Sequence, residues 1–387
     1  MKTEFNTIQV KVNDGVAVFS MNNPPVNQLS KHFIEELAQA LKMAYEDDDI
    51  KALVLTGTGK NFIAGADITQ IQGVKDRDVI FSRALEGTRF ISSLETGPKP
   101  IVAAINGNCL GGGLEIAMAC HYRVAAKGVN LGQPEVQIGL IPGAGGTQRL
   151  PRLIGLRYAL EMITLGKPIK SEVAFKRGLV DAVVDEQALM DTAVKAARQF
   201  TSGQLNIKAR MTRNQHHWIP SAAEKKAMMD FTKAMVAAQS KGYIAPMKAV
   251  TAIDEGLSYD MDKDLEREVE LFADCAVSDV AENLIGIFLN TRAAGRLDRI
   301  KGVEPAGIKK VAMLGGGVMG SGIVNLLLTS GCETILWDIN DAALEKGVAS
   351  VRQTFVYPIK KRKMKQEDLE NMLEKQLSTT TALTDLK

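Results

Sequence analysis

Residues 101–115 read IVAAINGNCLGGGLE, an apolar strand that leads into three consecutive glycines, Gly111–Gly113, and then into Glu115. A buried strand followed by a glycine-rich turn and a helix is typical of α/β proteins. The same order occurs earlier, where an apolar strand at residues 52–56 (ALVLT) precedes a glycine-rich turn and a helix predicted at about residues 79–94. Because strands and helices alternate through this part of the chain, we predict the α/β fold class.

The rest of the chain divides around this alternating part. A predicted hairpin turns at residues 13–15 (NDG), and Ser30 is placed to cap the helix that follows. From about residue 186 the strand signals fade and long helical patterns take over. Residues 302–307 (GVEPAG) have the composition of a boundary, and strand, glycine turn and helix restart beyond it. We therefore expect three parts, at residues 1–200, 201–307 and 308–387.

The composition is that of an ordinary globular protein. The 387 residues are 45% hydrophobic and 24% charged with a formal net charge of +2, which gives no general attraction to nucleic acid or a membrane surface. No run of about 18 apolar residues predicts a membrane span, and no secretion signal is visible. The cysteines are too scattered to predict a disulfide framework or a metal site: Cys109, Cys120, Cys275 and Cys332. These features favour a cytoplasmic protein without a metal.

Two glutamates, Glu115 and Glu135, are twenty residues apart (135 − 115), and each adjoins a glycine-rich turn. If both carboxylates face one pocket, they can hold a water molecule between them, with one accepting a proton while the other donates one. Addition of water to a polarised double bond requires this pair of roles. The alternative for Glu115 is a first-turn carboxylate that only favours the helix dipole, and for Glu135 a surface position after Pro134.

Three segments in close succession make the chain resemble the crotonase, or enoyl-CoA hydratase, superfamily over roughly residues 5–190. They are residues 61–67, 106–115 and 133–149. More narrowly, CHYR at residues 120–123 and PGAGGTQRLPR at residues 142–152 are similar to the α-subunit of the multifunctional fatty-acid oxidation enzymes. The resemblance implies a crotonase-type ββα spiral core with a helical C-terminal region, and a coenzyme A thioester as substrate.

The resemblance also implies roles for residues that match the family's motifs. The backbone N–H groups of Ala66 and Gly112 correspond to an oxyanion hole that holds the thioester oxygen as it becomes enolate-like, and Gly112 lies near a helix N-terminus that adds positive potential. Both glutamates, Glu115 and Glu135, would position and activate the water, and Glu135 would also deliver the proton to the α-carbon. The implied reaction is syn addition of water to a trans-2-enoyl thioester, giving a 3-hydroxyacyl thioester without any cofactor.

In this family, segments that match residues 25–27 and 64–68 hold the adenine end of coenzyme A by their backbone. The implied substrate-binding residues are Val26, Ala64, Asp67 and Ile68. Lys31 and Lys60 adjoin these loops and are candidates for the phosphates, with a solvated surface position as the alternative for both. His121 is interpreted as a packing or hydrogen-bonding residue and is assigned no chemistry.

A second motif, Gly315-x-Gly317-x-x-Gly320 with Met319 inside it, follows a predicted strand and opens a predicted helix. Glycines there permit a tight turn and the close approach of a pyrophosphate. Asp338, eighteen residues beyond Gly320 (338 − 320), can accept hydrogen bonds from a ribose, which favours NAD over NADP. The stretch resembles the start of the 3-hydroxyacyl-CoA dehydrogenase domain, which implies a partial Rossmann-like NAD-binding unit.

The sequence reaches Lys387, about 80 residues into this second resemblance, without a His-Glu dyad downstream of the motif. We therefore expect at most weak NAD binding and no dehydrogenase activity from this chain, with a vestigial or truncated fold as the alternative. Two strands with flanking helices would leave a sheet edge free to pair with another chain. The basic run at residues 360–365 (KKRKMK) is interpreted as a solvated helix face, with an anionic partner as the alternative.

The leading hypothesis is an enoyl-CoA hydratase acting on medium or long acyl-CoA thioesters in fatty-acid β-oxidation. Its nearest alternative is Δ3,Δ2-enoyl-CoA isomerisation, which needs one acid/base glutamate and the same oxyanion hole. A third hypothesis is a non-catalytic acyl-CoA or NAD-binding subunit that needs a partner. The resemblance implies a trimer-based homo-oligomer or a complex with a thiolase subunit, and the pattern of residues indicates no acyl-chain length.

Overall fold

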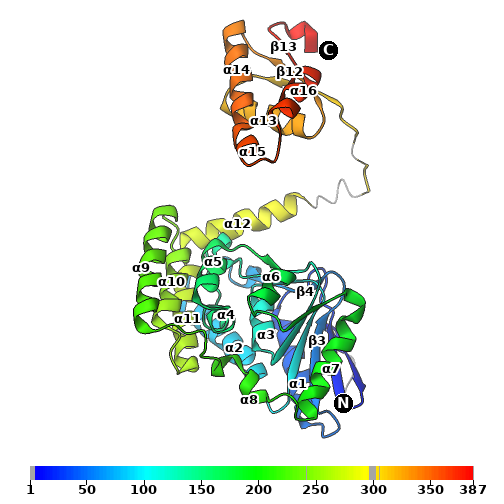
Figure 1. Cartoon of the computed structure of the whole chain (residues 1–387), viewed down its shortest axis with the longest axis vertical. Coiled ribbons are helices and arrows are strands. Elements are labelled where there is room, and N and C mark those ends of the chain that lie inside the picture. Colours follow the sequence, from blue (N-terminus) through cyan, green and yellow to red (C-terminus); the bar gives the residue numbers. More distant parts are fainter. Residues whose placement is uncertain (1–4, 241, 296–301, 305, 387) are drawn as a thin grey trace. The chain divides into compact units, whose positions relative to one another are not determined.

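The chain folds into two compact units, residues 1–296 and residues 297–387. The computed structural model describes residues 5–240, 242–295, 302–304 and 306–386 (Figure 1). Pro305, in the boundary segment predicted at residues 302–307, lies outside the described residues. Strands alternate with helices in both units, which confirms the predicted α/β class.

A six-stranded sheet forms the centre of the first unit. Its strand order is β1-β2-β3-β5-β7-β10, with β1 antiparallel to β2 and the other neighbours parallel. The predicted hairpin is confirmed, because Asn13 pairs with Val16 across the turn. The strands are β1 (Ile8–Asn13), β2 (Val16–Met21), β3 (Ala52–Gly57), β5 (Ile101–Ile105), β7 (Tyr122–Ala126) and β10 (Ala182–Val184).

A four-stranded sheet in the order β4-β6-β8-β9 is built largely from strands that directly follow those of the large sheet. Its strands are β4 (Asn61–Ala64), β6 (Asn108–Leu110), β8 (Asn130–Gly132) and β9 (Ile169–Lys170). Each repeat of the spiral thus consists of one strand of the large sheet, one strand of the small sheet and then a helix. Strands β3 and β4 with α2 (Arg77–Thr96) form one such repeat, and β5 and β6 with α3 (Gly112–Ala119) form the next. This repetition confirms the predicted ββα spiral.

Alternation along the strands gives the large sheet two buried faces. On β3, Val54 belongs to an apolar cluster closed by helix α7 (Leu189–Thr201), whereas Leu53 and Leu55 belong to the larger cluster on the other face. Successive side chains of a strand point to opposite faces. A continuous apolar run such as residues 52–55 is therefore what a sheet covered on both sides needs. Figure 1 shows α7 lying against the strands.

The remaining helices complete the first unit. Ser30 caps α1 as predicted, since its side chain accepts a hydrogen bond from the backbone N–H of Phe33 at 3.3 Å. The helices are α1 (Lys31–Glu46), η1 (Ile68–Gln70), η2 (Glu135–Ile138), α4 (Gly146–Ile154), α5 (Leu156–Leu165), α6 (Ser171–Lys176), η3 (Glu186–Ala188), α8 (Ile207–Arg210), η4 (Thr212–Asn214), α9 (Ala222–Gln239), α10 (Ala245–Glu255), α11 (Met261–Ala276) and α12 (Asp279–Ala294).

The helical stretch predicted after residue 200 packs onto the predicted core. Helix α11 contacts α2 and α4, and α10 contacts α4 and α5. In Figure 1, α9, α10 and α11 stand together on the side of this unit away from α7. The boundary placed at residue 200 therefore falls inside one compact unit, which reaches to residue 296. Residues 284–290 resemble the segment that links the two domains in the multifunctional enzymes, and they lie within α12.

The close approach of α3 to β4 depends on Gly113. A Cβ atom there would lie 2.2 Å from the backbone oxygen of Ile63, far inside contact distance. Gly113→Ala is therefore expected to lower the free energy of unfolding by about 1–3 kcal/mol or more, because the backbone has to move. Gly87→Ala, in helix α2 with open space around its Cβ position, is the control and should raise it by about 0.5–1 kcal/mol. Urea unfolding of both variants measures the difference; equal effects would contradict the packing.

The second unit is a parallel sheet in the order β11-β12-β13 with helices against it. The two predicted strands are confirmed, but the expectation of two strands is wrong, because β13 adds a third. Its apolar core includes Val324, Leu336 and Phe355. The elements are β11 (Lys310–Leu314), α13 (Val318–Thr329), β12 (Glu333–Trp337), α14 (Asp341–Thr354), α15 (Val356–Lys360), α16 (Gln366–Gln376), β13 (Leu377–Thr380) and η6 (Leu383–Leu386).

The basic run at residues 360–365 is solvated as predicted, with five of its six residues exposed and Met364 half-buried. Its interpretation as a helix face is wrong. Only Lys360 is helical, at the end of α15, and the other residues form the turn before α16. In an exposed turn the charged groups of this run stay in water, so the run loses little hydration free energy on folding.

Candidate active site

Glu115 lies in the first turn of α3, directly after the glycine-rich turn that follows β6. Gly111 makes this turn with a φ of +53°, a backbone conformation that side chains rarely adopt. The Glu115 carboxyl group is buried, with 3% of the residue exposed. Its Oε1 atom accepts hydrogen bonds from the backbone N–H groups of Ala144 and Gly146, both at 2.8 Å. Backbone groups just before and at the start of α4 therefore fix the Glu115 carboxyl group. A first-turn carboxylate that only favoured the helix dipole would not need these two bonds.

Glu135 is the first residue of the short helix η2 and is half-buried. In the amide orientation that satisfies both of its polar atoms, the buried Gln133 donates to both Glu135 carboxylate oxygens, at 3.0 and 3.1 Å. A Cβ atom on Gly111 would lie 2.7 Å from Glu135 Oε1. The Glu135 carboxyl group thus lies against the same glycine turn that leads into Glu115, and not on the open surface.

Two backbone amides converge beside these carboxyl groups. A Cβ atom on Gly112 would lie 3.8 Å from the Ala66 backbone nitrogen and 3.9 Å from Glu115 Oε2. Among the described residues, neither the Ala66 N–H nor the Gly112 N–H donates to a protein acceptor. Gly112 is also the first residue of α3, where the helix dipole adds positive potential. Two free N–H donors at a helix N-terminus form a site for a negatively charged oxygen.

The two carboxyl groups make each other harder to ionise. Burial, and next the charge of Glu115, raise the pKa of Glu135 well above its ordinary value near 4.5. Burial also raises the pKa of Glu115, but the N–H groups of Ala144 and Gly146 and the positive charge of Arg149 oppose that rise. Glu115 is therefore the better placed of the two to carry the charge, and Glu135 to hold a proton.

These shifts predict how stability depends on pH. A carboxyl group whose pKa is raised in the folded state binds more protons folded than unfolded, so its contribution to stability falls as pH rises above the ordinary value. Glu135→Gln removes that loss. The variant should gain stability relative to wild type as pH rises from 5 to 8, by up to about 1.4 kcal/mol per pH unit below the raised pKa. Thermal unfolding across this range measures the gain, and a constant difference would contradict the raised pKa.

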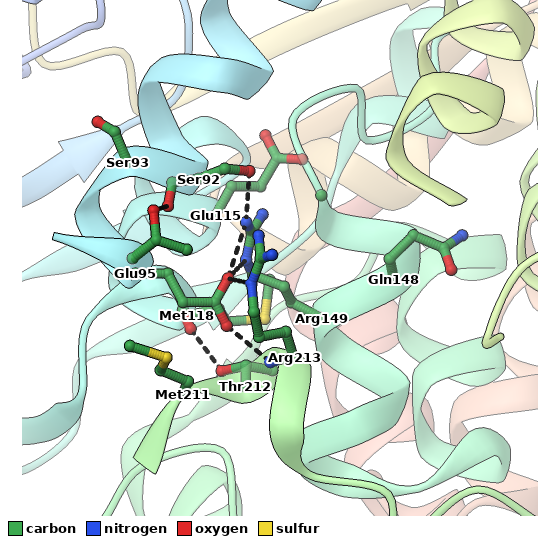
Figure 2. A network of polar contacts seen from close by, with 12 residues as sticks. Ser92, Ser93, Glu95, Glu115, Met118, Gln148, Arg149, Met211, Thr212 and Arg213 are labelled. Atoms are coloured by element: carbon green, nitrogen blue, oxygen red, sulfur yellow. Dashed lines mark hydrogen bonds and ion pairs between the residues drawn. The ribbon is translucent and has the colours of Figure 1, made fainter. Parts of the chain in front are cut away.

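A buried ionic network lies behind Glu115. Arg149, on α4, donates to the Glu95 carboxylate from Nε at 3.3 Å and from Nη2 at 3.2 Å, and to the backbone oxygen of Ala144 at 3.0 Å. The second Glu95 oxygen accepts the backbone N–H of Arg213 at 2.6 Å. Figure 2 shows the Glu95 carboxyl group meeting Arg149 and Arg213. The network thus reaches Ala144, whose backbone oxygen binds Arg149 and whose N–H group donates to Glu115.

Another buried glutamate, Glu268 on α11, was missed by the sequence reasoning. It has no exposed surface, and it accepts the backbone N–H groups of Gly145 and Thr147. Burial, and next the charge of Glu115, raise its pKa to about 8. A signal for it existed, because Glu268 falls on the same helical face as Leu265 and Val269, where a charged side chain is unusual.

The predicted coenzyme A segments lie together at one edge of the site. The Ala64 N–H donates to the Val26 backbone oxygen at 3.2 Å, which joins the two loops. Asp67 caps η1, accepting the Thr69 N–H at 3.2 Å, and Ile68 is half-buried in the first position of that helix. The Asp67 side chain is thus occupied by its own helix.

Three other polar residues singled out in the sequence, Lys31, Lys60 and His121, show no feature of a catalytic group. Lys31 and Lys60 are both exposed, as expected for solvated lysines. His121 is fully buried, its Nδ1 accepts the Ile101 N–H at 3.0 Å, and its Nε2 lies 3.1 Å from the Glu95 backbone oxygen. Burial lowers the pKa of His121 to about 4, so the ring is neutral. Its interpretation as a hydrogen-bonding residue is confirmed.

The glycine turn of the second unit has the geometry that a nucleotide turn needs. Gly315 has a φ of +91°, and a Cβ atom on Gly320 would lie 1.8 Å from the Gly315 backbone oxygen. Gly317 is the N-cap of α13, and Met319, in the first turn of that helix, is 77% exposed. Only glycine fits at the first and third positions, and the N-terminus of α13 stays open to solvent.

Asp338 follows β12 and lies beside this turn. Its Oδ2 atom accepts the Gly316 N–H and its Oδ1 atom accepts the Ile339 N–H, both at 2.8 Å, and these bonds lower its pKa. A charged carboxylate next to a glycine turn at a helix N-terminus fits the ribose and pyrophosphate of a dinucleotide. The residues present therefore fit the group that the sequence motif implies.

Within the described residues, no group of three or more His, Cys, Asp or Glu residues could hold a metal ion. No helix in the described part of the chain is long and apolar enough to cross a membrane.

The fold and the site define an α/β protein of ββα spirals, in which the carboxyl groups of Glu115 and Glu135 lie beside two backbone amides that donate to no protein acceptor among the described residues. Residues 11–245 match the family model of enoyl-CoA hydratase/isomerase, and the chain belongs to this family. Residues 310–387 match the model of the 3-hydroxyacyl-CoA dehydrogenase NAD-binding domain.

Relatives of known name cover both units. A peroxisomal fatty acid beta-oxidation multifunctional protein, MFP2 of Arabidopsis thaliana, is 36% identical over 96% of this chain and 52% of its own length. The fatty acid oxidation complex subunit alpha of Shewanella frigidimarina is 35% identical over 100% of this chain and 55% of its own length. The human mitochondrial delta3-delta2-enoyl-CoA isomerase matches with a TM-score of 0.55 and 26% identity, over 76% of this chain and 100% of that structure. The chain spans about half the length of the curated relatives it matches.

Proposed function

We propose that the first unit is an enoyl-CoA hydratase, which adds water to a trans-2-enoyl-CoA to give a 3-hydroxyacyl-CoA in fatty-acid β-oxidation. The observation that carries the proposal is the meeting of Glu115, Glu135 and two unpaired N–H groups at the start of α3. The two N–H groups would hold a negatively charged oxygen, and the two carboxyl groups would hold a water molecule. The family and the names of the multifunctional relatives support it.

In the proposed mechanism the thioester oxygen accepts hydrogen bonds from the Ala66 and Gly112 amides. Removing one such donor typically costs on the order of 3 kcal/mol in the barrier, so two of them form a large part of catalysis. Glu115 and Glu135 hold a water molecule, whose oxygen bonds to the β-carbon as electrons move toward the thioester oxygen. Glu135 supplies the proton for the α-carbon, and the water proton replaces it. The product is the substrate plus one water.

An apolar groove of about 790 Å³ borders the site and offers room for an acyl tail. It runs from Val136, which directly follows Glu135, along α5, α9 and α10, and its lining includes Leu160, Phe231 and Met235. Phe231 is 66% exposed, and exposed apolar surface of this kind suits an aliphatic ligand. The groove supports an aliphatic acyl tail as part of the proposed substrate.

Isomerisation is the second candidate function. The structural likeness to the human delta3-delta2-enoyl-CoA isomerase favours it, and that reaction would use Glu135 and the same amides. Chromatography of the products from a 2-enoyl and a 3-enoyl substrate separates the two. A 3-hydroxyacyl-CoA from the 2-enoyl substrate is the expected result. Isomer without hydrated product would assign the site to isomerisation, and no product from either would leave a binding subunit.

For the second unit we propose weak NAD binding at Gly315, Gly317, Gly320 and Asp338, with Met319 beside it. The open turn and the charged carboxylate support this. NAD titration followed by calorimetry tests binding, with Asp338→Ala as the variant that should lose it. The absence of dehydrogenase activity from this chain stays a prediction, and formation of NADH from a 3-hydroxyacyl-CoA would contradict it.

The proposed assembly is a trimer-based homo-oligomer or a complex with a thiolase subunit. The Shewanella relative is named as a subunit of a fatty acid oxidation complex, which supports a partner. A cytoplasmic location also stays a proposal, because a plant relative is named as peroxisomal. Light scattering of the purified chain, alone and with a thiolase, measures the assembly.

A further inference from the structure

Four consecutive backbone amides before and at the start of α4 alternate between two glutamates. The N–H groups of Ala144 and Gly146 donate to Glu115, both at 2.8 Å. Those of Gly145 and Thr147 donate to Glu268, the latter at 2.7 Å. The backbone of residues 144–147 therefore donates hydrogen bonds both to the proposed catalytic carboxyl group of Glu115 and to the carboxyl group of Glu268 on α11.

Glu268 has further bonds that fix this segment. The Thr147 hydroxyl group also donates to Glu268 Oε2, and the Gln148 side chain donates to the Thr147 hydroxyl oxygen at 2.9 Å. Glu268 and Thr147 are both without exposed surface. Because Glu268 sits on a sixteen-residue helix that packs on α2 and α4, it ties the segment to a rigid element.

We propose that Glu268 is a positioning residue, which sets the Ala144 and Gly146 amides so that they hold Glu115 against the reacting water. This inference rests on the proposed hydratase function. Glu268 touches no substrate and acts through residues 144–147. Misplacement of a reacting group by about 1 Å can lower a rate by about 10²-fold, so a loosened segment would reduce kcat. Binding of the thioester, held elsewhere, would change little.

The electrostatics agree with this arrangement. The charged groups acting on Glu268 and its neighbours are Glu115 on α3, Glu135 in η2 and Arg149 on α4. With its pKa raised to about 8, mostly by burial, Glu268 is largely protonated at neutral pH. The raised pKa limits the third negative charge that Glu268 would otherwise place beside Glu115 and Glu135.

Three substitutions on α11 test the proposal. Glu268→Leu removes both acceptor oxygens at similar volume and should lower kcat by about 10²-fold with KM within about three-fold of wild type. Glu268→Gln keeps one oxygen and should recover about ten-fold of that loss. Asp264→Asn is the matched control. Asp264 is buried one turn earlier, where Arg152 and Ser258 bind its carboxyl group, so the control should lower stability and keep kcat.

Two further readouts separate positioning from general damage. Glu115→Gln combined with Glu268→Gln should lose no more activity than Glu115→Gln alone, since Glu268 acts through Glu115. Hydrogen exchange of the peptide containing residues 143–147 should be faster in Glu268→Leu than in wild type. If Glu268→Leu does not fold, Glu268→Gln decides by the same two measurements.

Additive losses, or unchanged exchange of the 143–147 amides with unchanged kcat, would overturn the proposal. The exchange measurement does not depend on activity. If wild type formed no 3-hydroxyacyl-CoA while Glu268→Leu still loosened the segment, the proposed function would fail, and the positioning of Glu115 by Glu268 would stand.

Discussion

Glu135→Gln is expected to lower kcat for hydration of a trans-2-enoyl-CoA by about 10³-fold, within the range that a positioned proton donor contributes. Glutamine keeps the shape of the side chain and can still hold a water molecule, but it delivers no proton to the α-carbon. KM should change less than about three-fold, because the Ala66 and Gly112 amides still hold the thioester. Loss of absorbance of the conjugated thioester measures both constants. Glu86→Gln, the same change at an exposed position on α2, should leave them unchanged.

Glu115→Gln tests the other half of the pair. It should also lower hydration by at least about 10²-fold, since Glu115 completes the binding of the water and shares the base work. Isomerisation of a 3-enoyl-CoA, which needs one acid/base group, should fall less. If Glu115→Gln left hydration untouched, the paired-carboxylate mechanism would be wrong, and Glu135 with the two amides would act alone.

Glu95→Ala is expected to lower the free energy of unfolding by about 3–5 kcal/mol, the usual cost of breaking a buried ion pair from one side. Arg149 and Glu95 both have no exposed side-chain surface. Removal of the carboxylate leaves the buried Arg149 guanidinium without its hydrogen-bonded ion-pair partner, and the Arg213 N–H loses its acceptor. Activity should fall as well, because Arg149 also binds the backbone oxygen of Ala144, the residue whose N–H group donates to Glu115.

An exposed pair in the same unit provides the control for this prediction. Arg198 and Asp14 form an ion pair of 3.0 Å with 50% and 73% of their side-chain surface exposed. Asp14→Ala should change stability by about 0–1 kcal/mol, because water replaces most of the lost interaction. Urea unfolding of both variants gives the comparison. Equal losses would mean that burial of the Glu95 network does not determine its cost.

The first unit could be predicted from sequence where its signals are local. The strand at residues 52–56 is apolar at its first four positions, and the hairpin has a turn sequence at residues 13–15, so both predictions are correct. The Ser30 cap is likewise a local signal. The meeting of Glu115 with Glu135 depends on how β6, β8 and α3 are arranged in space. Spacing alone left it open, and the motif resemblance made it a specific expectation.

Other features had no local signal strong enough to predict them. Strand β13 reads LSTT, short and mostly polar, and only its pairing with β12 makes it a strand. The contact of Glu268 with residues 145 and 147 joins positions more than a hundred residues apart. An acidic residue on the apolar face of α11 indicates that the carboxylate binds buried hydrogen-bond donors. The sequence does not indicate which backbone N–H groups these donors are.

The most direct test is the hydration of trans-2-enoyl-CoA thioesters of increasing chain length by the purified chain, beside the Glu115→Gln/Glu135→Gln double variant. Wild type should form 3-hydroxyacyl-CoA. The double variant should lose about as much activity as the more severe single variant, because the two carboxyl groups act as one unit on one water. Failure of wild type to hydrate any chain length, or hydration by the double variant at the wild-type rate, would contradict a water held between Glu115 and Glu135.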